Sequence, residues 1–303
     1  MTSEIFDCVI IGAGPAGIIS AIQLKRAGFN IIIIEKNKIG GLLKNANKIE
    51  NYLGFPGSVK GKDLIALFYK QLLTFNIRPI KSEVLKIQNN DNNIFEIYTE
   101  NNRYNARTVI VATGTNHVLA GIPGEKKLLR QKVFYEIAEL PLKLSSVKYT
   151  KNIIIIGGGD AAFDYAINLH RIGHNPLIII RNLASCLNLL LKTAQENNIP
   201  YYEKTQPLCL YEENDKVCVR CRLNYKHKTF KADFVLIAAG RKPAHPQLKL
   251  KNKKLRNTDG LFFAGDVKNG RYRQVHIATG DAMQTAMNVM EYLQNDNNKT
   301  ARK

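Results

Sequence analysis

Isoleucine-rich runs without polar alternation occur in two pairs along the chain. Each pair belongs to one longer stretch, residues 6–37 or residues 151–182, and the stretches are related by a constant offset of 145 residues. Runs that do not alternate are typical of strands buried on both faces of a parallel sheet. Between the two runs, apolar residues recur at helical spacing, as in Ile18 and Ile22. The pattern therefore predicts a strand, a helix and a parallel strand, present twice.

Glycine clusters follow the first run of each stretch, and a single glycine follows each predicted helix. Gly28 and Gly173 stand where a left-handed residue commonly ends a helix. A tight glycine turn between a buried strand and a helix is typical of a dinucleotide-binding unit. We therefore predict an α/β chain with two Rossmann-like dinucleotide-binding domains.

The first cluster has the full dinucleotide-binding fingerprint, Gly12-x-Gly14-x-x-Gly17. Its glycines allow a tight turn, close approach of the backbone to a pyrophosphate, and close packing of helix on sheet. The amino end of the helix supplies N–H groups and partial positive charge for the phosphates. Glu35 ends the next strand, 21 residues after Gly14, where a carboxylate can accept a hydrogen bond from a ribose hydroxyl.

The second cluster, Gly157-x-Gly159-x-x-Ala162, is an accepted variant of the fingerprint. It lacks the acidic residue, because the position that corresponds to Glu35 is Ile180 and the next residue is Arg181. An arginine in place of that carboxylate favours a ribose 2′-phosphate, and hence NADPH over NADH. The alternative is that Arg181 is only a solvated residue after a strand.

Composition is that of a folded protein with two domains. The 303 residues suggest two domains at about 150 residues each, and five cysteines, an odd number, do not indicate a secreted disulfide framework. No stretch has the roughly 20 apolar residues of a membrane span. The first residues include Glu4 and Asp7 and no basic residue, unlike a secretory signal. We expect a cytoplasmic protein that does not enter the membrane.

Further motifs, in order along nearly the whole chain, resemble those of the low-molecular-weight thioredoxin reductases and their relatives. In these flavoproteins an NADPH domain interrupts an FAD domain. The motifs are Gly40-Gly41-Leu42, residues 49–56 (IENYLGFP), residues 111–115 (VATGT), residues 122–125 (IPGE), residues 157–162 (GGGDAA), residues 260–267 (GLFFAGDV) and Tyr272-Arg273-Gln274.

The resemblance implies an FAD-binding domain of residues 1–117 and 243–303, an NAD(P)-binding domain of residues 118–242, and a homodimer. Together with the first fingerprint, it implies that FAD is bound by Gly12, Gly14, Pro15, Ala16, Gly17, Glu35, Lys36, Gly41, Leu42, Asn51, Thr113, Gly114, Gly265, Asp266, Arg273, Gln274 and Val275. Together with the second, it implies that NADPH, or alternatively NADH, is bound by Gly157, Gly159, Asp160, Ala161, Ala162 and Arg181.

A short apolar run, residues 261–264, ends in Gly265-Asp266 and predicts a buried strand. In the family, the aspartate at the position of Asp266 bonds the ribityl chain of FAD, and the helix that follows points its amino end at the flavin. That helix is expected to begin near Gln274, and the sequence places its main part at residues 281–293. A positive helix end stabilises negative charge on a reduced flavin. His276 lies beside this edge, where it either tunes the flavin or only starts the helix.

The chain departs from the thioredoxin reductases where they carry a redox-active Cys-x-x-Cys. The aligned positions are Glu136 and Glu139. A carboxylate cannot replace the thiolate that attacks a disulfide, so we do not expect a competent thioredoxin reductase. The two glutamates could act as an acid and a base, but the favoured interpretation is two solvated residues on a helix. With no histidine or third carboxylate nearby, no metal site is predicted.

A second dithiol candidate is Cys218-x-x-Cys221. The surrounding alternation predicts a strand, on which residues three apart point to opposite faces. Cys209 lies on the predicted preceding strand, so a cross-strand approach of thiols is conceivable. Packing within the strand is the favoured interpretation, because redox pairs usually lie at the amino end of a helix.

The formal net charge of +19 raises the question of whether the protein binds a negatively charged partner. One dense basic stretch consists of Arg241, Lys242, Lys249, Lys251, Lys253, Lys254 and Arg256. It could steer an acidic electron-transfer protein, although a lysine-rich solvated surface is the simpler explanation. No recognition motif supports nucleic-acid binding.

These observations predict an FAD-dependent NAD(P)H:acceptor oxidoreductase without a dithiol centre, whose acceptor the sequence does not identify. No catalytic side chain is predicted, because the cofactor carries the chemistry of hydride transfer. Two alternatives stay open. One is a ferredoxin or flavodoxin reductase, although the chain lacks the C-terminal extension of such enzymes. The other is a catalytically silent FAD-binding protein, suggested by the loss of the dithiol and of the family's arginine cluster beside Arg181.

Overall fold

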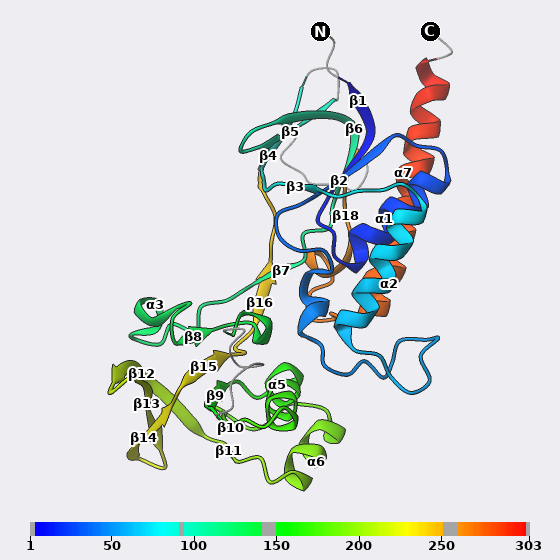
Figure 1. Cartoon of the computed structure of the whole chain (residues 1–303). Coiled ribbons are helices and arrows are strands. Elements are labelled where there is room, and N and C mark those ends of the chain that lie inside the picture. Colours follow the sequence, from blue (N-terminus) through cyan, green and yellow to red (C-terminus); the bar gives the residue numbers. More distant parts are fainter. Residues whose placement is uncertain (1–3, 91–93, 141–149, 251–259, 301–303) are drawn as a thin grey trace. The chain divides into compact units, whose positions relative to one another are not determined.

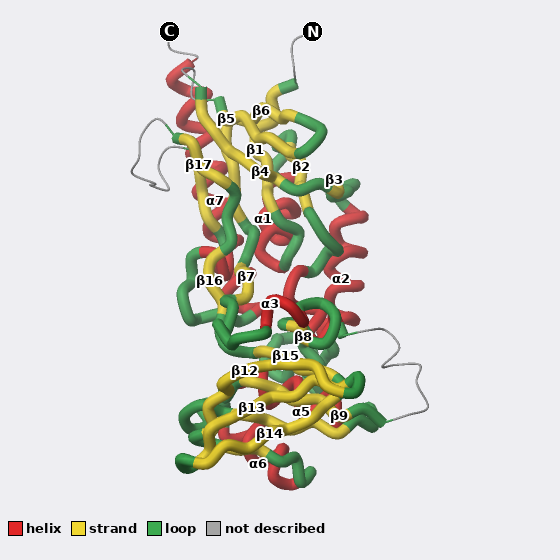
Figure 2. The backbone as a smooth tube through the Cα atoms, turned by 90° about the vertical axis from the view of Figure 1, so that its left-hand side faces the viewer, coloured by secondary structure: helices red, strands yellow, loops and turns green. Residues whose placement is uncertain are grey.

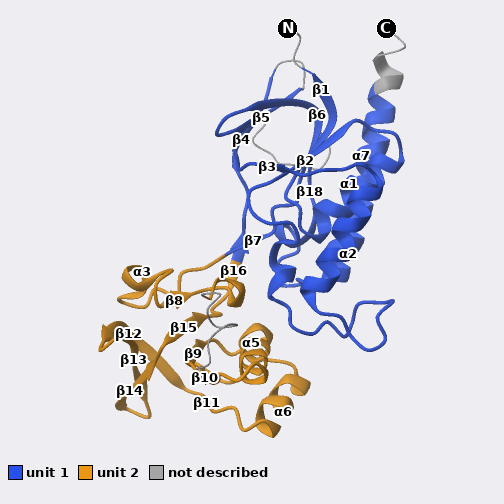
Figure 3. Ribbon diagram, in the orientation of Figure 1, with its two compact units in different colours: residues 1–116, 242–303 blue, residues 117–241 orange. Residues whose placement is uncertain are grey.

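The computed structural model describes residues 4–90, 94–140, 150–250 and 260–300. The chain, shown in Figure 1, divides into two compact units. Unit 1 consists of residues 1–116 and 242–303, and unit 2 of residues 117–241 (Figure 3). The division predicted from the sequence differs from this one by a single residue at each crossing. The two crossings pair as a short two-stranded sheet of β7 (Thr115–His117) and β16 (Arg241–Pro243).

Unit 1 contains one eight-stranded sheet, in the order β17-β4-β5-β6-β1-β2-β3, with β18 also pairing with β6. The pairing is parallel between β1 and β2, β1 and β6, β2 and β3, and β6 and β18. The elements are β1 (Ile5–Ile11), α1 (Pro15–Arg26), β2 (Ile31–Glu35), the 3-10 turn η1 (Gly41–Asn45), α2 (Gly61–Thr74), β3 (Ile80–Lys81), β4 (Val84–Asn89), β5 (Phe95–Thr99), β6 (Arg103–Val111), β17 (Gln247–Lys249), β18 (Leu261–Phe263), the 3-10 turn η3 (Gly265–Val267) and α7 (Val275–Thr300).

Both faces of this sheet are buried, as the non-alternating apolar runs predict. Cys8 and Ile10 of β1 face a core formed with α1 and α7. The intervening Val9 and Ile11 face a second core on the other side of the sheet. Helices α1, α2 and α7 lie side by side in Figure 1.

Unit 2 contains a five-stranded parallel sheet in the order β11-β10-β9-β15-β8, and a three-stranded antiparallel sheet in the order β12-β13-β14 (Figure 2). The elements are α3 (Glu125–Leu128), β8 (Val133–Phe134), the 3-10 turn η2 (Ile137–Glu139), β9 (Asn152–Ile156), α5 (Asp160–Arg171), β10 (Asn175–Ile179), α6 (Asn188–Glu196), β11 (Tyr201–Tyr202), β12 (Thr205–Glu213), β13 (Lys216–Leu223), β14 (Lys226–Ala232) and β15 (Phe234–Ile237).

The parallel sheet of unit 2 is covered by helices on one face and by the antiparallel sheet on the other. Ile153 and Ile155 of β9 pack with α5 and α6, whereas Ile154 and Ile156 pack with β12, β13 and β14. The predicted internal repeat and the α/β fold class are therefore confirmed. Each first helix ends as predicted, with Gly28 at φ +86° and Gly173 at φ +88°.

The last helix was predicted too short. It begins at Val275, as the resemblance implies, but it continues to Thr300 instead of ending at Leu293. None of the described helices is long and apolar enough to cross a membrane.

Candidate dinucleotide-binding sites

The first glycine turn joins the carboxyl end of β1 to α1, and two of its glycines are required by space. Gly12 has φ +104°, and a Cβ there would lie 2.5 Å from the Ala112 carbonyl oxygen. A Cβ on Gly17 would lie 1.8 Å from the carbonyl oxygen of Gly12. Gly14, which caps α1 ahead of Pro15, has no atom within 4 Å of its Cβ position. The turn is thus closed towards the protein and open at Gly14, where a ligand can approach the helix end.

Glu35 lies at the end of β2 and contacts this turn. Its Oε2 accepts a hydrogen bond from the Ala13 N–H at 2.7 Å, and its Oε1 accepts one from the Asn37 N–H at 2.8 Å. The carboxylate is therefore held in one orientation. It borders a cavity of about 140 Å³ lined by Ile11, Gly12, Ile34, Glu35, Lys36, Ser82, Glu83, Val84, Thr113, Asn116, Ala244, His245 and Pro246.

Strands β1, β6 and β18 are parallel neighbours, so their carboxyl ends bring three predicted motifs to one edge of the sheet. After β6, the Thr113 hydroxyl donates to the Ala244 carbonyl, and the Gly114 carbonyl accepts from the Ala244 N–H at 3.0 Å. After β18, Gly265 has φ +76° and packs so closely on Ala16 that a Cβ on Gly265 would lie 2.7 Å from the Ala16 Cβ. Asp266 follows within this turn.

The amino end of α7 contacts the 49–56 segment. The Asn51 side-chain amide donates to Gln274 Oε1 at 3.3 Å, and Val275 joins the apolar cluster beneath this segment. Gly41 also approaches the first turn, since its Cβ would lie 3.5 Å from the Gly14 Cα. Leu42 follows Gly41 in η1, and Arg273 is half-buried before α7.

Asp281, whose role the sequence did not indicate, and His276, which the sequence placed beside this edge, hold the edge together. Asp281 on α7 accepts a hydrogen bond from the Gly265 N–H at 2.7 Å and forms an ion pair with Lys268 at 2.7 Å. His276 accepts the Leu53 N–H on Nε2 at 2.9 Å and stacks on Tyr52 with ring centroids 4.5 Å apart. The histidine therefore orients the 49–56 segment in addition to starting the helix.

The donor set of this edge fits a dinucleotide. The open Gly14 position admits a phosphate, and Glu35 faces a cavity next to the turn. Asn269, four residues after Gly265, has a buried side-chain nitrogen with no hydrogen-bond partner among the residues that the structure describes. A buried donor of this kind needs an acceptor, which a bound polar ligand can supply.

In unit 2 the second glycine turn repeats this geometry at the carboxyl end of β9. A Cβ on Gly157 would lie 2.5 Å from the Ala238 carbonyl oxygen, and Gly159, the cap of α5, has open space around its Cβ position. Asp160 and Ala161 are exposed at the start of α5, and Ala162 is buried against the core. Arg181 lies exposed just beyond β10. The predicted residues are thus brought to one end of the sheet.

The loop after β10 is tied to the turn by groups that sequence reasoning missed. Asp160 Oδ1 accepts the Leu187 N–H at 2.8 Å, and Gly158 accepts the Ser185 N–H at 2.7 Å. Glu203, just after β11, accepts the Ala184 N–H at 2.7 Å. These contacts fix the loop that carries Arg181.

The two glutamates at the predicted dithiol positions do not behave alike. Glu139 is exposed, as expected, but Glu136 is only 6% exposed, and the prediction of a solvated residue is wrong there. The Glu136 carboxylate forms an ion pair with Arg241 and accepts a hydrogen bond from the Tyr165 hydroxyl at 3.3 Å. The segment is a three-residue 3-10 turn rather than a helix. Arg241 was expected in a solvated basic stretch; its partner lies 105 residues away, which local pattern cannot reveal.

All five cysteines are free. Cys218 and Cys221 lie on β13 as predicted, and only Cys221 belongs to the core between the two sheets. Burial raises the pKa of Cys8 and of Cys221 to about 12, and burial also raises the pKa of Cys218. Thiols with raised pKa are poor nucleophiles. Among the described residues, no group of histidine, cysteine, aspartate or glutamate side chains could hold a metal ion.

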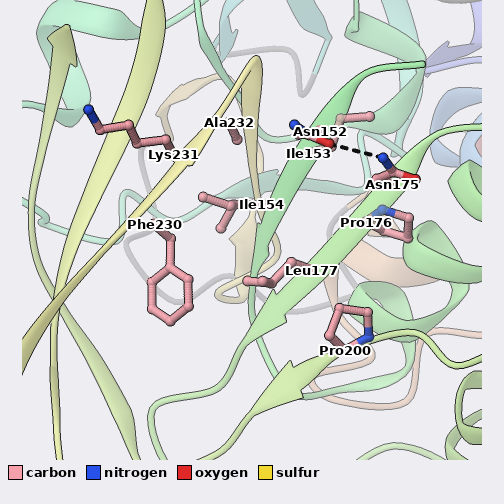
Figure 4. Close-up of a pocket in the computed structure, with 10 residues that line it drawn as sticks. All are labelled: Asn152, Ile153, Ile154, Asn175, Pro176, Leu177, Pro200, Phe230, Lys231 and Ala232. Atoms are coloured by element: carbon pink, nitrogen blue, oxygen red, sulfur yellow. Dashed lines mark hydrogen bonds between the residues drawn. The ribbon is translucent and has the colours of Figure 1, made fainter.

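A second cavity, of about 200 Å³, lies in unit 2 at the opposite end of the parallel sheet (Figure 4). The first residues of β9 and β10, Asn152 and Asn175, hydrogen bond there at 3.1 Å. Its lining is otherwise mostly apolar and includes none of the predicted site residues.

Two glycine turns, each at the carboxyl end of parallel strands, define a protein with two dinucleotide-binding units. The chain belongs to the pyridine nucleotide-disulphide oxidoreductase family, whose model matches residues 6–282. Within that family it is thioredoxin reductase-like. FAD and NADPH, the cofactors predicted from the sequence, are those of this group.

Similar proteins extend over nearly the whole chain. The thioredoxin reductase of Ureaplasma parvum is 30% identical and covers 98% of this chain and 100% of its own length. The thioredoxin reductase of Bacillus subtilis is 26% identical, with 96% of each chain covered. The crystal structure of T. acidophilum thioredoxin reductase superposes with a TM-score of 0.84 at 29% identity, and covers 94% of this chain and 98% of its own.

Proposed function

We propose that this protein is an FAD-dependent NAD(P)H:acceptor oxidoreductase that works without a dithiol centre. Unit 1 holds FAD at the edge formed by Gly14, Glu35 and Asp266, and unit 2 holds the nicotinamide dinucleotide at Gly159. A flavin bound in unit 1 would supply the redox chemistry, namely acceptance of a hydride from a reduced nicotinamide and transfer of the electrons to an external acceptor. The predicted homodimer and cytoplasmic location stay predictions.

One observation carries the proposal. No atom lies within 4 Å of the Cβ position of Gly14 or of Gly159, so a ligand can approach both glycine turns. The two positions of the family's dithiol, in contrast, carry carboxylates, one of them buried in an ion pair with Arg241. The protein's residues then bind and orient the two cofactors. No side chain needs to transfer a proton to the reacting atoms.

The test is an anaerobic titration of the purified FAD-loaded protein with NADPH and, separately, with NADH. Bleaching of the flavin absorbance by either nucleotide is the expected result. A Gly159→Glu variant is the matched control. The variant should fold, because no atom lies within 4 Å of the Gly159 Cβ position, but its carboxylate places a negative charge where the pyrophosphate would lie. It should keep FAD and lose the bleaching. A wild-type flavin that stays oxidised with both nucleotides would contradict the proposal and favour a silent FAD-binding protein.

A second candidate, a ferredoxin or flavodoxin reductase, is supported by one surface. On β13, Arg220 and Arg222 alternate with core residues and face away from the core. Arg220 contacts His227 at 3.3 Å and Arg222 contacts Gln206 at 2.8 Å, and neither forms an ion pair with any described residue. Uncompensated arginines attract an acidic protein. Reduction of such an acceptor that slows steeply with added salt, and slows further in Arg220→Gln/Arg222→Gln, would support this candidate.

A further inference from the structure

The buried pair of Glu136 and Arg241 is the least expected feature of unit 2. The Glu136 side chain is 7% exposed and that of Arg241 is 23% exposed, so part of each side chain stays accessible. Arg241 contacts Oε1 of Glu136, and the Tyr165 hydroxyl donates to Oε2. Burial raises the pKa of Tyr165, and the Glu136 charge raises it further. The phenol therefore stays a hydrogen-bond donor to a charged carboxylate.

The pair lies at the ligand-binding end of its sheet. Glu136 follows β8 after a single residue, and Arg241 lies beyond the carboxyl end of β15. In the strand order β11-β10-β9-β15-β8, the glycine turn follows β9, and the loop with Arg181 follows β10 on one side of it. Dinucleotides lie across the carboxyl ends of such strands, with the pyrophosphate at the glycine turn. If the adenosine half lies on the β10 side, the nicotinamide half lies on the side of β15 and β8.

A carboxamide is chemically complementary to an ion pair of a carboxylate and a guanidinium. Its NH₂ group donates to a carboxylate and its carbonyl accepts from a guanidinium, and both charged groups have several hydrogen-bonding positions. We propose that Glu136 and Arg241 bind the carboxamide of the nicotinamide ring, with Tyr165 as a positioning residue for the carboxylate. This inference rests on the proposed function, because it assumes that unit 2 binds a nicotinamide dinucleotide.

The experiment measures the affinity of the full-length, FAD-loaded protein for three ligands by calorimetry. The ligands are NADP⁺, its 3-acetylpyridine analogue, in which a methyl group replaces the carboxamide NH₂, and 2′-phospho-ADP-ribose, which lacks the ring. The NAD⁺ series is run in parallel. Wild type should bind the natural nucleotide roughly tenfold more tightly than the analogue, the usual effect of losing one hydrogen bond to a charged group.

Glu136→Gln should lose most of this discrimination, and Glu139→Gln, which alters the exposed neighbour, should keep it. Glu136→Asp retains a charge for Arg241 and serves if the glutamine variant does not fold; its shortened carboxylate should also discriminate less. All variants should bind 2′-phospho-ADP-ribose as wild type does. Equal wild-type affinity for nucleotide and analogue, or full discrimination in the Glu136 variants, would overturn the inference alone. Failure of wild type to bind any ligand would overturn the proposed function as well.

Discussion

Buried carboxylates in this protein are stable because nearby donors replace water. Glu125 is 2% exposed and accepts the Tyr135 hydroxyl and, at 3.1 Å, the Ile122 N–H. Glu96, on β5 of unit 1, is 9% exposed and is similarly surrounded. A buried carboxylate without such partners would cost several kcal/mol. Substituting one of these glutamates, or one of its donors, should therefore lower the stability of the folded protein.

Glu96 should make folding pH-dependent. Hydrogen bonds from Gln88 at 2.6 Å and Tyr98 at 2.7 Å hold the pKa of Glu96 below its usual value, with Arg103 adding to the effect and burial opposing it. A carboxyl whose pKa is lowered by folding stabilises the protein above its unfolded pKa of about 4.3. That stabilisation is lost as the pH falls through the folded pKa. Glu96→Gln should therefore lower the urea unfolding midpoint at pH 7, and the difference from wild type should shrink below about pH 4.3.

Glu100→Gln serves as the control for this measurement, because Glu100 is the residue after β5 and its side chain is exposed to solvent. It should shift the midpoint little at any pH. A Glu96→Gln difference that stays constant from pH 7 to pH 3 would show that ionisation of this carboxyl does not contribute.

His276 offers a second test at the scale of a single residue. His276→Ala removes the hydrogen bond to the Leu53 N–H and the stacking on Tyr52, together worth about 2 kcal/mol. The 49–56 segment should then hold FAD less well, with flavin release up to about thirtyfold faster. Release is followed by the rise in flavin fluorescence on dilution. His170→Ala, an exposed change on α5 of unit 2, is the comparison, and equal release rates in the two variants would rule out the positioning role.

At the scale of elements, the strand–turn–helix units could be predicted from the sequence because their determinants are local. Non-alternating apolar runs, glycines at fixed spacing and a glycine stop all lie within about thirty residues. The Glu136 contacts could not be predicted, since Arg241 lies on the strand that leaves unit 2. The same holds for Asp281, which reaches back to Gly265 from α7, and for Glu203, which holds the loop after β10. The roles of these residues depend on partners that are distant in sequence, so the local sequence pattern does not reveal them.

The first glycine turn predicts opposite outcomes for two neighbouring glycines. Gly17→Ala places a Cβ 1.8 Å from the Gly12 carbonyl oxygen and should destabilise the protein by about 3 kcal/mol or more. Gly14→Ala meets no atom within 4 Å and should cost less than about 1 kcal/mol. It should still weaken FAD binding, because its methyl group lies where the backbone would approach a pyrophosphate. Thermal unfolding of the apoproteins and FAD titration separate the two effects, and a stable Gly17→Ala protein would contradict the observed packing.

For the whole molecule, the number of electrons that it can store depends on whether two of its thiols can form a redox-active disulfide. The thiols of Cys8 and Cys221 are fully buried, and no disulfide links any of the five cysteines. A flavin stores about two electrons, and a flavin with a redox-active disulfide stores about four. Electron capacity therefore distinguishes the proposed dithiol-free oxidoreductase from a disulfide reductase without knowledge of the natural acceptor.

Anaerobic dithionite titration of the FAD-loaded protein should accordingly end at about two electrons per flavin. The double variant Cys218→Ala/Cys221→Ala should give the same end point, because burial raises the pKa of both thiols and they do not form a pair on one face of β13. Cys209→Ala extends the comparison to the neighbouring strand. An end point near four electrons in wild type that falls to about two in any cysteine variant would identify a redox-active thiol pair. The presence of Glu136 and Glu139 at the family's dithiol positions would then not mean that the protein lacks a redox-active dithiol.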